Sequence, residues 1–280
     1  YSIDFYTPDM LTLDDGILYV DAFKIKMQEN PSEIIKIAQI NKVRLEKYDV
    51  ILMRQDPPFN MSYITATHLL ETIRNKVLII NDPFYVRNCP EKLFVNNYKQ
   101  FMPPTLITRN INEIMHFKEK YDQFVIKPLY GNGGSGVFYS DKNDKNFQSI
   151  VDYFMQVSEE QFILQKFIPK VEFGDKRIIL INGKIAGAIN RIPKSGEIRS
   201  NMHVGGQAVI TEISEYEKKI CSAISKDLID FGLFFVGIDV IDNLITEINV
   251  TSPTGIREIY NLTGNDLTTI FWDEIESKIN

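Results

Sequence analysis

A segment near the carboxyl-terminal end of the chain, 235–254, carries three oxygen-bearing side chains inside otherwise apolar runs. The two β-branched runs flank Asp242-Asn243, a pair that favours a tight hairpin turn. Glu247 and Asn249 are two residues apart and leave the same face of one strand, and Asp239 can join them from the partner strand. Carboxylate and amide oxygens are the ligands that Mg²⁺ prefers. This spacing predicts a metal site.

The alternative is a solvated sheet face with ordinary polar residues. We favour the metal site, because the apolar residues on both sides predict burial and an unpaired buried carboxylate is costly.

A glycine-rich stretch, Gly131-Asn132-Gly133-Gly134-Ser135-Gly136, lies between two predicted strands, 124–127 and 137–139. No Lys-Ser/Thr pair and no helix follow it, which argues against a P-loop or a dinucleotide fingerprint. A glycine loop between strands can instead fold its backbone N–H groups over phosphates, with Lys127 supplying a positive charge. On local evidence a flexible turn beside a solvated lysine is an equally good interpretation.

Four arginines stand near these features: Arg177 and Arg191 at the ends of predicted strands, Arg199 in a long loop, and Arg257 after a proline turn. Any one of them is more simply explained as a surface residue. Together, beside a metal hairpin and a phosphate flap, they indicate recognition of carboxylates and phosphates by bidentate hydrogen bonds.

The elements that must position these residues alternate between strand and helix patterns, which predicts an α/β protein. An apolar strand at 48–53, a helix capped by Asn60 and a second strand at 77–80 form a βαβ unit. Asn182-Gly183 predicts a hairpin, Ser214 with Glu217 predicts a capped helix, and 192–207 is too long for a simple connector. Further predicted elements are a helix after Asn110, a helix after Asp144, a strand at 161–167 and an amphipathic helix from Asp266 to the end.

Composition limits the class of protein. The chain has 280 residues, 44% of them hydrophobic and 24% charged, values typical of globular domains. Its net charge of −6 argues against a nucleic-acid partner. Two distant cysteines, no metal-type cysteine or histidine spacing and no membrane-length apolar run lead us to expect a cytoplasmic protein without a membrane span.

Six motifs, in order over almost the whole chain, resemble those of the bacterial glutathione synthetases, members of the ATP-grasp superfamily. They are Met53-Arg54-Gln55-Asp56-Pro57-Pro58-Phe59, Glu91-Lys92-Leu93-Phe94, Ile126-Lys127-Pro128-Leu129, Gly174-Asp175-Lys176-Arg177, Ala188-Ile189-Asn190-Arg191-Ile192-Pro193 and Thr246-Glu247-Ile248-Asn249-Val250-Thr251-Ser252-Pro253-Thr254. The last motif is highly specific, and the first separates this family from other ATP-grasp ligases.

The resemblance implies an N-terminal preATP-grasp α/β domain at 1–88 and an ATP-grasp domain at 89–280, with 121–168 as the ATP-lid subdomain. It implies an ATP-dependent ligase that joins γ-glutamylcysteine and glycine through an acyl phosphate, with Mg²⁺ or alternatively Mn²⁺. A homotetramer is also implied.

The resemblance further implies roles for individual residues. ATP would be held by Lys92, Lys127, Gly131–Gly136, the strand end Gln165, Lys166, Phe167 and Ile168, and Asp175. The dipeptide and acyl phosphate would face Arg177, Arg191, Ser252, Pro253 and Thr254. The catalytic residues would be Arg177, Arg191 and Arg199, the last of them in a mobile lid, Ile192–Gln207. The metal would be held by Asp239, Glu247 and Asn249.

Two departures from the family pattern stand out. Tyr1–Tyr6 aligns with the family's second strand, so we expect one preceding βα unit to be missing from this sequence, which begins with Tyr. Gln207 stands where members of the family carry arginine at the end of the lid. Two alternatives therefore stay open: another ATP-grasp carboxylate–amine ligase, such as a D-alanine–D-alanine or glutamate-adding enzyme, and an ATP-binding remnant without full catalysis.

Overall fold

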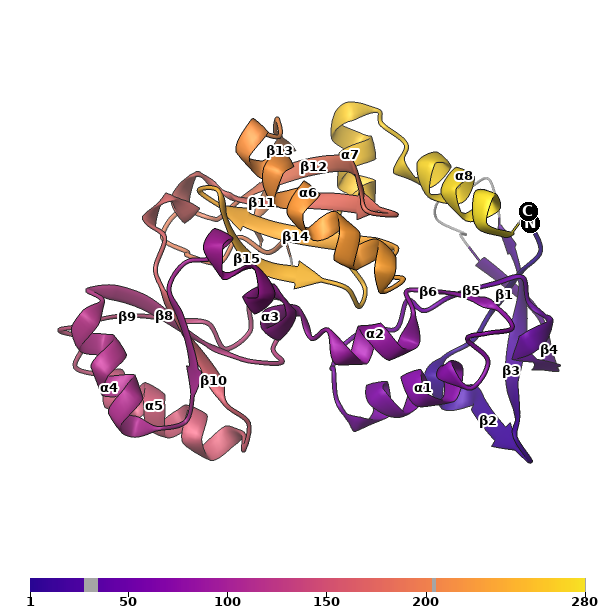
Figure 1. Ribbon diagram of the computed structural model, residues 1–280, viewed down its shortest axis with the longest axis horizontal. Coiled ribbons are helices and arrows are strands. Elements are labelled where there is room, and N and C mark those ends of the chain that lie inside the picture. The colour runs from indigo at the N-terminus through magenta and orange to yellow at the C-terminus, as the bar shows by residue number, and fades with distance from the viewer. Residues whose placement is uncertain (28–34, 203–204, 280) are drawn as a thin grey trace.

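Figure 1 shows the computed structural model, which describes residues 1–27, 35–202 and 205–279. Strands in these ranges form four sheets, and the chain runs from an N-terminal part through a small lid-like part to a central part. Of the helices described, none is both long and apolar enough to cross a membrane.

The N-terminal part contains an antiparallel sheet in which β3 pairs with each of the other three strands. A separate parallel pair, β5 and β6, is joined through α1, as the predicted βαβ unit requires. Asn60 caps α1 by accepting a hydrogen bond from the backbone N–H of Tyr63 at 3.1 Å, as predicted. The strands and helices are β1 (Ile3–Phe5), β2 (Leu11–Asp14), β3 (Ile17–Met27), β4 (Ile35–Arg44), β5 (Val50–Leu52), α1 (Met61–Glu71) and β6 (Leu78–Ile80), with 3₁₀ turns at Pro8–Met10 and Leu45–Lys47.

Two short helices, α2 (Pro83–Asn88) and α3 (Glu91–Phe94), and a 3₁₀ segment at Val95–Phe101 connect this part to the rest of the chain. Asp82 starts α2 by accepting hydrogen bonds from the backbone N–H groups of Phe84 and Tyr85. The connection therefore begins with a well-capped helix rather than a flexible linker.

The lid-like part is a four-stranded antiparallel sheet of order β7-β10-β8-β9. Aromatic and aliphatic side chains of α4 and α5 share one apolar cluster with β8 and β10, so both helices cover the same face. The elements are β7 (Thr105–Thr108), α4 (Ile111–Lys120), β8 (Gln123–Pro128), β9 (Phe138–Asp141), α5 (Phe147–Val157) and β10 (Phe162–Lys166). This sheet begins at β7, upstream of the 121–168 segment, and the domain boundaries stay predictions.

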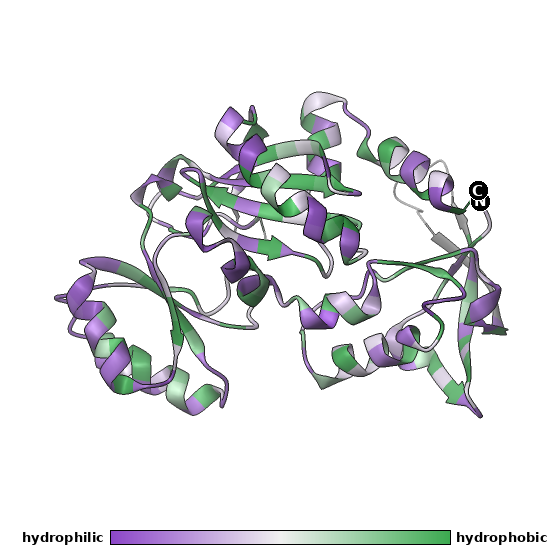
Figure 2. Ribbon diagram, viewed as in Figure 1, coloured by the Kyte–Doolittle hydropathy of each residue, from purple (hydrophilic) through white to green (hydrophobic). Residues whose placement is uncertain are grey.

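The central part is a five-stranded antiparallel sheet of order β13-β12-β11-β14-β15. Alternate residues of β11 serve opposite faces: Ile178 packs in the cluster that includes α6, and Ile179 packs in the cluster that includes α7 and α8. In Figure 2 the apolar strands of this sheet lie between helices of mixed character. The elements are β11 (Asp175–Ile181), β12 (Lys184–Ile192), β13 (Gln207–Ile210), α6 (Glu215–Asp230), β14 (Phe235–Ile241), β15 (Leu244–Asn249), α7 (Ile256–Thr263) and α8 (Leu267–Ile279), with a 3₁₀ turn at Pro169–Phe173.

Both predicted hairpins of the central sheet are present. Asp242 and Asn243 have φ angles of 49° and 62°, and Asn182 and Gly183 have 48° and 74°, the left-handed values that a two-residue turn between twisted strands needs. The capping box of Ser214 and Glu217 at the start of α6 is also confirmed. The first-named turn fixes which residues of β14 and β15 lie opposite one another, and the second does so for β11 and β12.

Candidate active site

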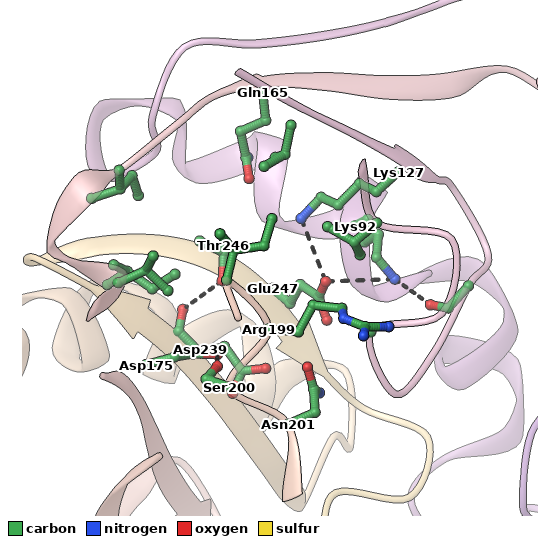
Figure 3. Close-up of a pocket in the computed structure, with 18 of the residues that line it drawn as sticks. Lys92, Lys127, Gln165, Asp175, Arg199, Ser200, Asn201, Asp239, Thr246 and Glu247 are labelled. Atoms are coloured by element: carbon green, nitrogen blue, oxygen red, sulfur yellow. Dashed lines mark hydrogen bonds and ion pairs between the residues drawn. The ribbon is translucent and has the colours of Figure 1, made fainter. Parts of the chain in front are cut away.

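A cleft lies between the lid-like sheet and the central sheet, and encloses about 870 Å³ when its open mouth is counted. Figure 3 shows polar side chains entering the cleft from α3, from both sheets and from the loop after β12. The cleft therefore collects residues that are far apart in the sequence.

At one end of the cleft, two lysines face a single carboxylate. The Nζ atoms of Lys92, from α3, and Lys127, from β8, lie 3.6 Å and 3.5 Å from Oε1 of Glu247, on β15. Burial lowers the pKa of Lys127, an effect that the negative charge of Glu247 partly offsets. Two cations held at the edge of a cleft are suited to anionic groups such as phosphates.

The glycine-rich loop lies beside these lysines, as predicted for a phosphate flap. Residues 131–135 line the cleft, and the ammonium of Lys92 donates a hydrogen bond to the carbonyl of Gly131. Gly134 has a φ of 78° and packs against Arg199 and Asn201 of the loop after β12. Gly136, in contrast, is not among the lining residues; it packs against the ring of Pro128.

The strand end predicted to face adenine also borders the cleft. Residues 165–168 all line it, and Gln165 is held by a hydrogen bond from Nε2 to the hydroxyl of Thr105 at 2.8 Å. The ring of Phe167 contacts Tyr139 edge-on, with centroids 5.0 Å apart. Backbone groups at the end of an otherwise paired strand are suited to the polar edge of a base.

Asp239 forms the centre of a buried charge network. Its carboxylate accepts two hydrogen bonds from Arg177, at 2.5 Å and 2.9 Å, and lies 2.9 Å from Nη2 of Arg191. The same Nη2 donates to Asp175 at 2.6 Å, and the hydroxyl of Ser200 donates to Asp175 at 2.9 Å. Fork-shaped pairing of this kind fixes the orientation of both arginines.

The two aspartates of this network differ in their pKa. For Asp239, burial favours the neutral form, but the positive charges of Arg177 and Arg191 prevail and hold its pKa at about 2. For Asp175, burial is the larger effect and raises its pKa, against the attraction of Arg191. The two arginines are thus matched by two carboxylates, with Asp239 ionised between Arg177 and Arg191. Asp175 and Asp239 line the cleft, and neither arginine is among its lining residues.

The three predicted metal ligands lie on two paired strands. Asp239 is opposite Glu247 in the register of β14 and β15, and Asn249 is opposite Gly237. Asp239 and Asn249 are buried, with 4% and 9% of their surface exposed, which excludes the solvated-face alternative. Nδ2 of Asn249 lies 3.2 Å from Asp239. Two carboxylates and an amide oxygen are hard donors, so this donor set fits Mg²⁺.

No group of three or more His, Cys, Asp or Glu side chains gathers as a metal site within the described ranges. The set above has only two carboxylates, and both already have cationic partners. The assignment of the metal to these residues therefore stays a prediction.

None of the predicted substrate residues is among the residues that line the cleft. Ser252, Pro253 and Thr254 lie on the loop after β15. Ser252 donates to the carbonyl of Gln55 at 2.8 Å, and Arg54 donates to the carbonyl of Pro253 at 3.0 Å. Arg177 reaches the carbonyl of Thr254 at 3.2 Å. The first and last motifs of the chain thus meet directly. Their role in binding the dipeptide stays a prediction.

The predicted lid corresponds to the stretch between β12 and β13. Its residues 198–201 line the cleft, and Arg199 is paired with Glu197 at 2.6 Å. Positions 203 and 204 of the predicted lid lie outside the described residues. Gln207 is the first residue of β13 and is exposed, opposite Ile192 in the sheet.

Several residues of the site were not predicted from the sequence. Ser200, Asn201 and Thr246 line the cleft, and Thr246 lies where the register of β14 and β15 shifts by one residue. A bulge of this kind gives no signal in the hydrophobic alternation. Ser200 and Asn201 directly follow Arg199 in the sequence, and this neighbourhood could have identified them as candidates.

Asn81 is a further residue that the sequence did not single out. Its side chain donates to the carbonyls of Phe235 and Val250, at 2.8 Å and 2.7 Å, and accepts from the backbone N–H of Phe235 at 2.7 Å. It thereby joins the start of β14 to the end of β15, next to Asn249.

Comparison with known families gives two matches that together span most of the chain. Residues 1–87 match the N-terminal domain of prokaryotic glutathione synthetase, and residues 91–264 match its ATP-grasp domain. A glutathione synthetase of Agrobacterium fabrum is 46% identical over 278 residues, covering 99% of this chain and 87% of that protein. One of Bradyrhizobium diazoefficiens is 47% identical, covering 99% and 88%.

Solved structures with a similar fold are much less similar in sequence. The D-cycloserine synthetase DcsG has a TM-score of 0.65 at 14% identity, covering 85% of this chain and 86% of that one. The ATP-grasp ligase PsnB, complexed with a minimal precursor, has a TM-score of 0.63 at 14% identity, covering 91% and 86%. These likenesses concern the fold alone and agree with the predicted ATP-grasp architecture.

Proposed function

The chain belongs to the prokaryotic glutathione synthetase family, and on that premise we propose that it uses ATP to join γ-glutamylcysteine to glycine. It is an ATP-dependent ligase by its family and its ATP-grasp fold. The observation that carries the assignment to this cleft is the meeting of Lys92 and Lys127 with Glu247 beside the glycine-rich loop.

Different residues have different roles in phosphoryl transfer. Lys92, Lys127 and the loop 131–135 hold the phosphates of ATP, and residues 165–168 border the base. Such a transfer needs little acid–base chemistry from the protein, and depends on alignment and on neutralised charge.

Arg177 and Arg191 receive the substrate carboxylate and the acyl phosphate formed from it. Their orientation is already fixed by Asp239 and Asp175, so little reorganisation is needed when charge develops on the substrate. Ser252, Pro253 and Thr254 complete the dipeptide side. Residues of the lid, Arg199 among them, exclude water that would hydrolyse the intermediate.

Asp239, Glu247 and Asn249 are the residues that would hold Mg²⁺, or Mn²⁺ in its place. A divalent cation there supplies charge neutralisation for the phosphate oxygens. Assembly as a homotetramer, which the resemblance implies, and a cytoplasmic location, which the cysteine usage leads us to expect, stay proposals.

The test is a substrate-dependence assay with the purified chain. We expect ADP and glutathione to form in equal amounts when ATP, Mg²⁺, γ-glutamylcysteine and glycine are all present. Replacement of glycine by D-alanine or glutamate should abolish the product. Ligation of either of those amines would identify another ATP-grasp ligase, and ATP binding without ADP release would identify a catalytically impaired protein.

A further inference from the structure

Tyr130 is the residue immediately before the glycine-rich loop, and the assignments above leave it without a role. Its ring stacks on the ring of Phe59, with centroids 5.9 Å apart and planes 24° from parallel. Phe59 ends the first motif of the chain, on the stretch between β5 and α1. The stack therefore joins the N-terminal part directly to the loop that we assign to the phosphates.

The ring of Phe59 has a fixed position within the N-terminal part. It contacts the ring of Tyr63, with centroids 5.1 Å apart, and Tyr63 is buried, with 1% of its surface exposed. The residue after Phe59 is Asn60, which caps α1. Phe59 can therefore serve as a rigid support for the ring that stacks on it.

The ring of Tyr130 lies outside the cores of the protein. It is 39% exposed, and it belongs to none of the apolar clusters that the described residues form. A half-exposed side chain removes little apolar surface from water, so it contributes little to folding. The stack on Phe59 therefore orients the start of the glycine-rich loop more than it stabilises the fold.

The backbone of this loop would be flexible without anchors. Four of the six residues at 131–136 are glycines, and Gly133, Gly134 and Gly136 have φ angles of 61°, 78° and 69°. Glycine loses more conformational freedom than any other residue when it is ordered. A loop that is already ordered in the free protein binds its ligand more tightly, because this entropy is not lost again on binding.

We propose that Tyr130 positions the glycine-rich loop for the phosphates of ATP by stacking on Phe59, an inference that rests on the proposed phosphate-binding role of this loop. Without the stack, a smaller fraction of the free protein holds the loop in its binding position. The apparent dissociation constant for ATP rises by the factor by which that fraction falls, whereas the rate at saturating ATP does not change. Tyr130 acts through the loop and needs its ring, not its hydroxyl.

The experiment measures the binding of ATP and of adenosine by calorimetry, and kcat and KM for ATP in glutathione formation. Adenosine has no phosphates, so its affinity reports on the base end of the cleft within each variant. The proteins are wild type, Tyr130→Ala, Tyr130→Phe, Phe59→Leu and the double variant Tyr130→Ala/Phe59→Leu. The matched control is Tyr153→Ala, because Tyr153 is 47% exposed and contacts Phe138 at 5.8 Å, entirely within the lid-like part.

We expect Tyr130→Ala to raise the dissociation constant and KM for ATP about fivefold, the factor that an aromatic pair typically contributes. The affinity for adenosine and kcat at saturating ATP should change less than about twofold. Tyr130→Phe and Tyr153→Ala should match wild type. The double variant should bind ATP about as weakly as Tyr130→Ala, because two substitutions that remove the same contact do not add.

Three results would overturn the inference: unchanged ATP binding by Tyr130→Ala, an equal loss of ATP and adenosine binding, or effects that multiply in the double variant. Failure of the proposed function gives a different pattern. Wild-type protein that binds ATP but forms no glutathione would reject the proposed ligation, and the binding comparison would still decide the role of Tyr130. Wild-type protein that does not bind ATP would reject both.

Discussion

Nζ of Lys127 and the carboxylate of Glu247 lie 3.5 Å apart, so the lid-like sheet and the central sheet meet at an ion pair. Lys127 stands near the end of β8, and Glu247 stands on β15 opposite Asp239. This pairing brings a lysine proposed to bind phosphate and a predicted metal ligand to the same point of the cleft. The reaction centre should therefore depend on Glu247 without the fold depending on it.

Substitution Glu247→Gln tests this. Since the side chain is 22% exposed and keeps its size, we expect native circular dichroism. Ligase activity should fall at least about a hundredfold, from the loss of charge at the phosphates. Lys76→Gln, at a surface ion pair with Glu46, is the control. Near-normal Mg²⁺-dependent phosphate release by Glu247→Gln would refute the assignment.

The loop after β12 should be protected when substrates bind. Lys194 and Ser195, in this loop, are both exposed, so trypsin can reach the bond between them in the free protein. We expect ATP with γ-glutamylcysteine to slow cleavage after Lys194 by about tenfold or more, as for a loop that closes over ligands. Mass spectrometry of the fragments gives the rate. Equal rates with and without ligands would count against a lid.

Asn81 should stabilise the fold and hold β15, the strand that carries the predicted metal ligands Glu247 and Asn249, in place. Asn81→Ala removes three buried hydrogen bonds and leaves backbone groups of Phe235 and Val250 without them. We expect the free energy of unfolding to fall by about 3 kcal/mol, measured by urea denaturation. Asn88→Ala, which removes an exposed bond to the carbonyl of Phe84, should change it by less than about 0.5 kcal/mol. Equal effects of the two substitutions would show that the hydrogen bonds of Asn81 do not stabilise the fold.

The two thiols should be unreactive in the folded protein. Burial raises the pKa of Cys89 to about 11 and that of Cys221 to about 12. At pH 8 the thiolate fraction is then about one in a thousand or less, so iodoacetamide should label the native protein far more slowly than the urea-unfolded chain.

The raised pKa values of Cys89 and Cys221 also make the stability of the folded protein depend on pH. A folded-state pKa above the unfolded value means that the folded protein holds the thiol protons more tightly. Stability from these groups is therefore complete below about pH 8.5 and declines as the pH rises toward 11. Rapid labelling of the native protein at pH 8 would show that the thiols are not buried.

Much of the site follows from local sequence rules. The two-residue spacing of Glu247 and Asn249, together with the turn at Asp242-Asn243, predicts that Asp239 joins them from the partner strand, and the register of β14 and β15 confirms this. Turn chemistry and strand alternation act over a few residues, so they can be seen in the sequence. Caps were predictable for the same reason, at Asn60 and Ser214.

Contacts between distant segments could not be predicted in this way. Two examples are the hydrogen bonds from Asn81 to Phe235 and Val250 and the bond from Arg54 to Pro253. These bonds depend on how whole elements pack. The predicted helix after Asp144 begins only at Phe147, because Asp144 is used in local bonds to Ser140 and Asn146. The lid-like sheet likewise recruits β7 from upstream of the predicted segment, since β10 pairs with β7 as well as with β8.

The most direct test of the proposed acyl-phosphate mechanism follows the oxygen atoms of the dipeptide. γ-Glutamylcysteine is labelled with ¹⁸O in the carboxyl group that becomes the amide, and the released phosphate is analysed by mass spectrometry after ligation to glycine. Transfer of one ¹⁸O to phosphate for each glutathione formed is the expected result, because the acyl phosphate passes that oxygen to the departing phosphate. Glutathione formed with unlabelled phosphate would contradict the mechanism assigned to this cleft.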